Sequence, residues 1–527
     1  MADIDDEHID ECDSSDAHVV LPHPQFVRPL GSLMLAADGA NLRDTSLGAL
    51  VALPDELLLR VLGMGGAPAL ARCACASRGL RVLAYHDELW KQYLLENLPS
   101  SSWLRWDARG WRHAYLRHVG VSLPAASPSD DASSLFARGP RYYSDVLHAP
   151  WHCGTAAIPR RWSQHSNNSF SIPRVAASSL SVDEFARRFE QPGKPVILTG
   201  LTDSWPAAKS WSFDSLRARF GNGAGFHVGG HTMGLSDFFD YSMTNTDEQP
   251  LYLFDKHFRE TSAAHGHALA DDYTVPSYFA ADRDLFASLP TAFRPDHAWL
   301  IAGGTRSGSG WHVDPNQTSA WNACICGTKK WILTPPGHPP PGVNASSDGA
   351  SVVSPISLFE WFRVFYAYVD RMRREAQRSA PPAGPPTDTR SADLQTCGQA
   401  LEATVTEGEL LFVPAGWWHC CLNLEPAIAI TGNYAPASSA SSVLQYVRAG
   451  DRAGDLVSGL PDELRPLLAD EFEAVCKQRC PEALVAPTLP ASAEAADVTR
   501  PPPPEASAPA TALVGREEVA EFRFSFG

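Results

Sequence analysis

The chain of 527 residues lacks several features that mark broad protein classes. It has no run of about 18 or more apolar residues, so we expect no membrane span. Residues 1–16 are acidic and contain no apolar stretch, which argues against a secretory signal. The 11 cysteines form no spaced Cys-x-x-Cys pair. We therefore expect a reduced, intracellular protein.

Clusters of basic residues are also scarce, and the net charge is −17. This balance argues against a strong intrinsic nucleic-acid surface, because such surfaces need clustered Lys and Arg. A basic protein substrate, such as a histone tail or another segment rich in Arg and Lys, would instead be attracted electrostatically. The charge thus favours a protein partner over a nucleic acid.

Hydrophobic residues make up 44% of the chain and include 15 Trp and 23 Phe, which is enough for substantial cores. The length suggests roughly two to four domains. Shifts in composition and periodicity predict the following order: a disordered leader (1–50), a small helical module (51–97), a helical linker (98–171), a β domain (172–450) with an insertion (335–399), a helical segment (451–480) and a mostly disordered tail (481–527).

The helical module begins at Leu53-Pro54-Asp55-Glu56, with a proline at the start and acids in the first turn. Short helices are expected over residues 67–76, 79–85 and 87–95, the last of which contains Trp90. This Leu-Pro-x-Glu start and late tryptophan resemble the F-box, a family that binds a Skp-type adaptor of a cullin ubiquitin ligase. The alternative is an ordinary helical cap on the next domain. The glycine-rich residues 63–66 depart from the family pattern.

Many short β-rich segments separated by Gly and Pro turns follow between residues 195 and 433. This pattern predicts a mainly β fold with some helix, arranged as an antiparallel barrel or jelly roll. Within the insertion, residues 358–378 place Trp361, Val369 and Met372 on one face of a helix. We expect the insertion to cover the mouth of the site.

His312 and Asp314 lie two residues apart in Gly-Trp-His-Val-Asp-Pro (310–315). Residues i and i+2 of an extended strand share a face, so the pair supplies two ligands of a 2-His-1-carboxylate site for Fe(II). His419, which follows an apolar strand and a Pro-Gly turn, is the expected third ligand. A lone His-x-Asp pair could equally be a hydrogen-bonded surface pair. Either Lys329 or Lys330 should point inward, where a buried cation needs an anionic partner.

These motifs, together with Ala-Trp-Asn-Ala (320–323), Gly-Thr-Lys-Lys-Trp (327–331) and Val-Pro-Ala-Gly-Trp-Trp-His (413–419), resemble the Jumonji-C family of cupin-type 2-oxoglutarate oxygenases. Within this family, the motifs resemble the branch that contains the bifunctional arginine demethylase and lysyl hydroxylase, together with the plant F-box/Jumonji-C proteins. The resemblance implies a double-stranded β-helix over residues 172–450. It also implies that Lys329 pairs with the distal carboxylate of 2-oxoglutarate. The other implied roles are iron binding by His312, Asp314 and His419, and co-substrate contacts by Asn322, Thr431, Tyr252 and Ser309, with Asn433 at the pocket edge.

Ser309 stands where that branch often has Thr, and Lys330 is expected to face solvent. On sequence alone Tyr252 could equally be a core aromatic, and Asn322 and Thr431 could merely satisfy backbone groups.

The resemblance implies an enzyme that uses Fe(II), 2-oxoglutarate and O₂ to oxidise a C–H bond of a protein. Arginine demethylation, of a histone or another protein, is the first expectation, and lysyl hydroxylation is the alternative within the same class. A different class is a non-enzymatic receptor of a ubiquitin ligase. Family analogy places the protein in the nucleus, with the cytoplasm as an alternative.

Overall fold

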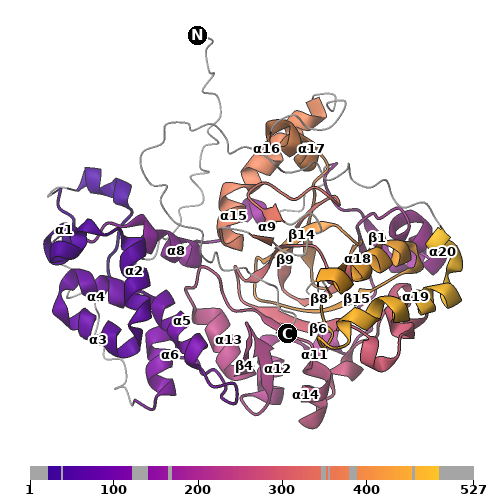
Figure 1. Cartoon of the computed structure of the whole chain (residues 1–527), viewed down its shortest axis with the longest axis horizontal. Helices are drawn as coiled ribbons and strands as arrows, with labels where there is room; N and C mark the ends of the chain where they lie inside the picture. The colour runs from indigo at the N-terminus through magenta and orange to yellow at the C-terminus, as the bar shows by residue number, and fades with distance from the viewer. Residues whose placement is uncertain are drawn as a thin grey trace.

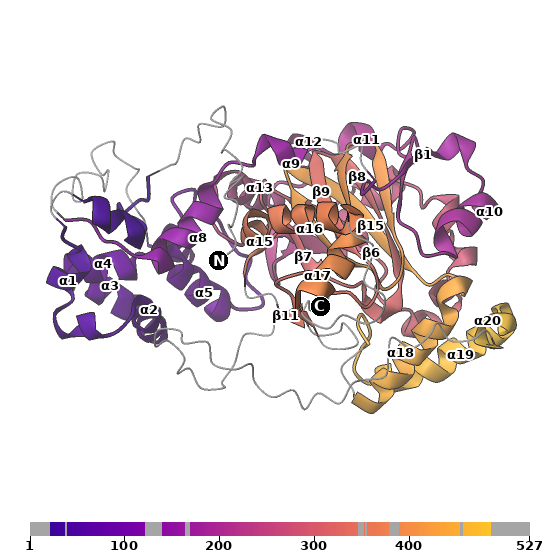
Figure 2. The same ribbon diagram turned by 90° about the horizontal axis from the view of Figure 1, so that it is seen from above.

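The computed structural model describes residues 22–36, 39–121, 140–163, 169–345, 352–353, 356–378, 389–453 and 457–485. A group of small helices lies at one end, the β domain follows, and the last helices lie at the opposite end (Figures 1 and 2). Among the helices of these ranges, none combines the length and the hydropathy of a transmembrane span.

The amino-terminal helices are α2 (Asp55–Met64), α3 (Gly66–Ala76), α4 (Arg78–Ala84), α5 (Asp87–Asn97) and α6 (Trp111–His118). Each of the first four buries an apolar stripe, including Leu58, Leu70, Leu83 and Trp90. The indole Nε1 of Trp90 donates to the Ala84 carbonyl at 2.8 Å. This bond links the end of α4 to α5.

The leader differs from its prediction. Residues 30–52 form η1 (Leu30–Leu35), α1 (Leu42–Ser46) and η2 (Gly48–Ala52), and Leu42 is buried. The prediction of disorder was wrong for the described part of 22–50, whereas residues 1–21 and 37–38 lie outside the described residues. The reason is long-range: Asn41 bridges to Arg141 through the backbone, about a hundred residues away, and local sequence does not reveal such a partner.

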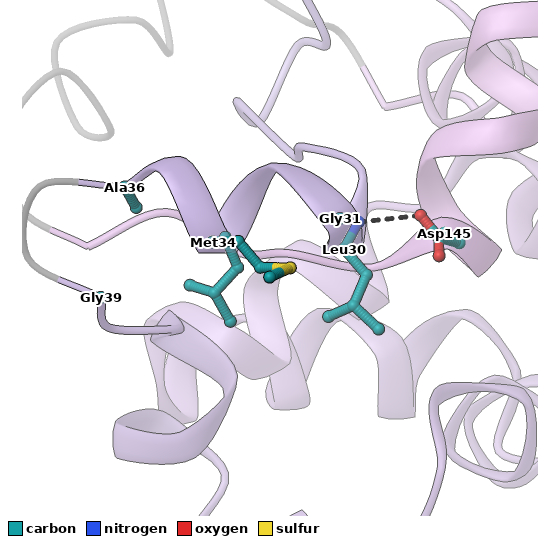
Figure 3. Close-up of a pocket in the computed structure, with 7 residues that line it drawn as sticks. Leu30, Gly31, Met34, Ala36, Gly39 and Asp145 are labelled. Carbon is teal, nitrogen blue, oxygen red and sulfur yellow. Dashed lines mark hydrogen bonds between the residues drawn. The ribbon is translucent and has the colours of Figure 1, made fainter.

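The same leader docks on α8 (Asp145–Thr155). The Leu30 N–H donates to Asp145 Oδ1 at 2.8 Å, beside a hollow that is also lined by the exposed Met34 (Figure 3). Asp145 is the one ionisable residue in that lining, and its carboxylate already accepts the Leu30 N–H. We therefore interpret the hollow as a packing feature of the leader and not as a functional site.

The β domain consists of two main sheets. The larger has the order β1-β2-β13-β8-β15-β6-β5-β3-β4 and the smaller the order β12-β9-β14-β7. Apart from the parallel pair β1–β2, neighbouring strands in these two sheets are antiparallel. The strands are β1 (Arg174–Ala176), β2 (Val196–Thr199), β3 (Gly225–Val228), β4 (His231–Gly234), β5 (Leu253–Asp255), β6 (Ala298–Gly303), β7 (Gly308–His312), β8 (Ser319–Cys326), β9 (Thr328–Thr334), β12 (Leu401–Thr406), β13 (Glu409–Val413), β14 (Trp418–Asn423) and β15 (Ala427–Tyr434).

Alternate residues of both sheets meet in one apolar interior, with Ile197 and Leu411 from the large sheet facing Leu333 and Val405 from the small one. The predicted mainly β jelly roll behind a helical module is confirmed. Around it lie α9 (Arg160–Ser163), α10 (Val182–Phe185), η4 (Ala186–Glu190), α11 (Ala207–Ser210), α12 (Phe213–Phe220), α13 (Leu235–Thr244) and α14 (Phe258–Ala264).

The insertion carries β10 (Asn344–Ala345), β11 (Val352–Val353), α15 (Leu358–Val364), α16 (Tyr366–Arg378) and α17 (Thr389–Gly398). Trp361 and Phe362 belong to one apolar cluster with Ile332 and Leu422 on the outward face of the small sheet. The helices α15 and α16 lie beside β14 and β9 (Figure 1). We expected a cover for the site mouth, but α15 and α16 instead cover the back of the sheet that carries His312 and His419. They bury its outer apolar face, which water would otherwise reach.

The last helices, α18 (Ala440–Ala453), α19 (Leu468–Arg479) and α20 (Pro481–Val485), form a separate apolar cluster in which Phe472 contacts Phe286. Residues 486–527, which include most of the predicted disordered tail, lie outside the described residues.

Candidate metal centre

Three side chains converge between the sheets. One ligand atom from each of His312, Asp314 and His419 lies within 4.8 Å of the others. His312 at the end of β7 pairs directly with His419 on β14, which places both imidazoles on one face. Asp314 sits two residues beyond His312 in extended conformation, at the start of a short 3-10 turn. Sequence spacing and cross-strand register thus assemble the predicted trio.

Each imidazole is oriented by its own strand. His312 Nδ1 lies 2.7 Å from the Gly310 carbonyl, and His419 Nδ1 lies 3.0 Å from the Trp417 carbonyl. A nitrogen that donates to a carbonyl carries the proton, so Nε2 is left as the coordinating atom in both rings. Burial lowers the pKa of both His312 and His419 to about 4, which keeps them neutral.

Only one of the two carboxylate oxygens of Asp314 accepts a hydrogen bond from a described residue. Its Oδ1 accepts from Asn433 Nδ2 at 3.3 Å, whereas the buried Oδ2 has no hydrogen-bond partner among the described residues. Burial raises the pKa of Asp314 to about 6. An orphaned buried carboxylate oxygen beside two neutral imidazoles is the donor set that a ferrous ion needs, so these residues fit the metal.

A second buried polar group lies on the neighbouring strand. Lys329 Nζ donates to Asn423 Oδ1 at 2.7 Å and to Tyr252 Oη at 3.0 Å, and the side chain is 1% exposed. Among the described residues, no carboxylate lies within an ion-pair distance of this ammonium. A buried cation with only neutral partners is suited to the carboxylate of a small acid.

The other predicted pocket residues also lie on inward positions. Asn322 on β8 pairs with Thr431 on β15, and Thr431 Oγ1 donates to the Trp321 carbonyl at 2.8 Å. The buried Asn322 Oδ1 has no hydrogen-bond partner among the described residues. The alternative role considered from sequence, a hydrogen bond to the backbone, therefore applies to Thr431. It does not apply to the Asn322 side-chain oxygen.

Ser309 reaches the interior through an irregularity. It pairs with Cys421, whereas His312 pairs with His419, so three steps along β7 match two along β14. Such a bulge returns Ser309 to the face of His312 despite their odd spacing. Simple alternation from His312 would have placed Ser309 outside.

Asn423 is a pocket residue that the sequence analysis missed. It accepts from Lys329, and its Nδ2 donates to Ser307 Oγ at 3.0 Å. The signal was present, because His419 and Asn423 are four residues apart on β14 and alternation puts both inward.

Lys330 corrects another expectation. It does point away from the interior, but it is 1% exposed and its Nζ lies 3.3 Å from Glu402 Oε2. Tyr366 Oη on α16 donates to the same oxygen at 2.7 Å, and Arg373 Nη1 lies 3.4 Å from it. Lys330 is buried and not exposed as predicted, because the insertion covers this face of the sheet.

Comparison with known proteins agrees with this geometry. A cupin-like domain model matches residues 182–440, and an F-box-like model matches residues 50–96. The chain is 37% identical over 455 residues to the arginine-specific demethylase JMJ22 of Arabidopsis thaliana, which covers 86% of this chain and 81% of the relative.

Two further relatives match somewhat more than half of this chain. The bifunctional arginine demethylase and lysyl-hydroxylase psr-1 of Caenorhabditis elegans is 34% identical over 56% of this chain and 71% of its own length. The 2-oxoglutarate and iron-dependent oxygenase JMJD4 of Homo sapiens is 24% identical over 51% of this chain and 63% of its own length.

A two-sheet cupin core with an inward His-Asp-His trio defines the class of Fe(II)- and 2-oxoglutarate-dependent oxygenases. The chain belongs to the Jumonji-C family of this class, and an F-box-like domain precedes its catalytic domain.

Proposed function

We propose that the protein is a protein arginine demethylase. The observation that carries the proposal is the similarity to an arginine-specific demethylase over 86% of the chain. The inward trio His312, Asp314 and His419 supports it, as does the buried Lys329 without an acidic partner among the described residues.

In this proposal His312, Asp314 and His419 hold iron, and the Asn433 amide fixes the Asp314 carboxylate. Lys329 receives the distal carboxylate of 2-oxoglutarate, with Tyr252 and Asn423 orienting its ammonium. Iron and 2-oxoglutarate, when bound, supply the O₂-dependent oxidation of a substrate C–H bond. The apolar interior around Leu333 and Val405 keeps bulk water away from that oxidation.

The proposed substrate is a basic protein, with histones as the leading candidates, and the proposed compartment is the nucleus. The net charge of −17 supports attraction of a basic tail. Fluorescence microscopy of the tagged chain tests the compartment, and exclusion from the nucleus would remove histones from consideration.

Mass spectrometry of methylarginine histone peptides incubated with Fe(II) and 2-oxoglutarate tests the reaction. Oxidation of an N-methyl group gives an N-hydroxymethyl group that releases formaldehyde, so the peptide loses a methylene. Lysyl hydroxylation, the other reaction for which psr-1 is named, would instead add one oxygen. Succinate production that persists unchanged in His312→Ala would refute the oxygenase site itself.

We propose a second role as a substrate receptor of a cullin ubiquitin ligase. The F-box-like match supports it, and so does α2, on which Leu57, Val61 and Met64 are exposed at helical spacing. Co-purification with a Skp-type adaptor should be lost in Val61→Asp while oxygenase activity remains. If the wild-type protein does not co-purify with the adaptor, the receptor role is wrong and the module is only a helical cap on the catalytic domain.

A further inference from the structure

A buried ion pair joins the F-box-like helices to the catalytic domain. Lys91 Nζ on α5 lies 3.0 Å from Asp247 Oδ2, and their side chains are 9% and 7% exposed. We propose that Lys91 is a positioning residue for the co-substrate pocket, acting through residues 247–252. The inference rests on the proposed pocket role of Lys329 and Tyr252.

The segment after α13 has no regular structure until β5 begins at Leu253. Side chains from outside the segment hold it in place. Lys91 Nζ donates to the Gln249 carbonyl at 3.0 Å, and Trp111 Nε1 donates to Asp247 Oδ1 at 2.7 Å. Lys91 lies on α5 and Trp111 on α6, so these two amino-terminal helices fix the course of a catalytic-domain loop.

Tyr241 on α13 connects this clamp to the end of the segment. Its hydroxyl donates to Asp247 Oδ2 at 2.6 Å and accepts from the Leu251 N–H at 2.7 Å. The ring is fully buried and packs edge-on against Trp106 and Trp111. Because the oxygen both donates and accepts, a displaced Asp247 also weakens the anchor of Leu251.

Tyr252 follows Leu251 directly, and its hydroxyl accepts from Lys329 Nζ. Its ring lies where a Cβ on Gly303 would come within 2.6 Å, so it has a narrow slot in the pocket wall. A shift of the 247–252 segment therefore moves the phenol that orients the Lys329 ammonium. Lys91 reaches the co-substrate only through these groups.

Two variants of the full chain test the proposal. Lys91→Met removes the ammonium and keeps an apolar stem, and Tyr241→Phe removes the connecting hydroxyl and keeps the packed ring. We expect each to weaken 2-oxoglutarate binding to the Fe(II)-loaded, oxygen-free protein by about 2- to 30-fold, measured by the charge-transfer absorption band. The KM for 2-oxoglutarate should rise by a similar factor while kcat at saturating 2-oxoglutarate stays near the wild-type value.

Hydrogen–deuterium exchange of the metal-free protein supplies a readout that is independent of turnover. Peptides that span residues 245–252 should exchange faster in both variants. The matched control is Glu88→Gln, because Glu88 is a more exposed neighbour, 3.8 Å from Lys91 Nζ. This control should leave 2-oxoglutarate affinity within twofold of wild type.

Wild-type affinity in a folded Lys91→Met or Tyr241→Phe protein would overturn the proposal. A reduced kcat with an unchanged KM would do so as well, since it would indicate only a smaller active fraction. Lys329→Met separates the two levels of inference: if it binds 2-oxoglutarate normally, the proposed pocket is wrong, and if it alone loses binding, only the role of Lys91 falls.

Discussion

Lys329 and Lys330 are adjacent, equally buried and differently partnered. Lys329 faces the barrel interior and meets Tyr252 and Asn423, whereas Lys330 faces the insertion and meets Glu402. Strand alternation alone accounts for the division. Two identical side chains therefore have different surroundings: Lys329 faces the proposed co-substrate pocket, and Lys330 forms a buried ion pair under the insertion.

Lys329→Met should weaken 2-oxoglutarate binding at least about 30-fold, because losing one partner of a buried charge pair costs about 2 kcal/mol or more. Anaerobic titration with Fe(II) and 2-oxoglutarate measures it. Lys330→Met is the matched control, since Glu402 keeps Tyr366 and Arg373 as partners. Equal losses in the two variants would contradict the assignment.

Asn433→Ala should lower Fe(II) affinity about 10- to 100-fold, the usual effect of removing a group that orients a metal ligand. Asn433 Nδ2 also donates to Thr318 Oγ1 at 2.8 Å, so the amide is itself held in place. Competition with a chromogenic chelator gives the affinity, and an unchanged melting curve would show that the fold is intact. Wild-type affinity would mean that Asp314 needs no such support.

Sequence reasoning identified residues whose position follows from spacing. His312, Asp314 and His419 fall on one face by alternation and register. Ser309 faces the interior only because β7 contains a bulge, which no local pattern announces. The burial of Lys330 depends on a helix more than thirty residues away, so its solvent exposure could not be judged locally.

At the scale of elements, α6 begins beside a half-buried acid, Asp87. Asp87 accepts from the Trp111 N–H at 3.2 Å and the Arg112 N–H at 3.4 Å, which satisfies two donors at the helix start. Gly110 precedes the helix with φ of 106°, and a Cβ there would lie 2.4 Å from the Asp87 carboxylate. Only glycine permits this approach.

Burial raises the pKa of Asp87 from 3.8 to about 6. The Asp87 carboxyl therefore binds its proton more tightly in the folded state than in the unfolded state. The resulting contribution to the free energy of unfolding is complete below pH 3.8 and is lost as the pH rises through 6. The free energy of unfolding of wild type relative to Asp87→Asn should fall between about pH 4 and 6 and stay level above that. Urea unfolding at several pH values measures it, and a flat difference would contradict the shift.

Periodicity located the regular elements of the helical module well. The helices expected over residues 67–76, 79–85 and 87–95 are α3, α4 and α5. The leader was misjudged because its order comes from partners such as Arg141 and Asp145. Segments held by distant partners carry little signal of their own.

At the scale of the whole molecule, the largest apolar cluster of the described residues joins the amino-terminal helices to the β domain. It runs from Leu58 and Leu83 in those helices to Leu410 and Phe412 in the large sheet. Packing is therefore continuous between the F-box-like module and the barrel. Two domains that share a core are expected to unfold together.

Leu83→Ala should lower the stability of the entire molecule by about 2–5 kcal/mol, although Leu83 lies in the small module. Calorimetry should show a single transition that moves as a unit, and loss of barrel tryptophan fluorescence should follow the same curve. Two transitions, with only the first displaced, would show that the module and the barrel are energetically separate.

The anchoring of each imidazole to the carbonyl two residues before it has a consequence for metal loading. Backbone carbonyls orient both imidazole rings, so the ligand geometry is already formed in the metal-free protein. A zinc finger differs, because it folds only when its metal binds. Chelators should strip and ferrous salts restore the centre without refolding. Loading of the centre would then be a simple binding equilibrium set by the concentration of free Fe(II), with no folding step coupled to it.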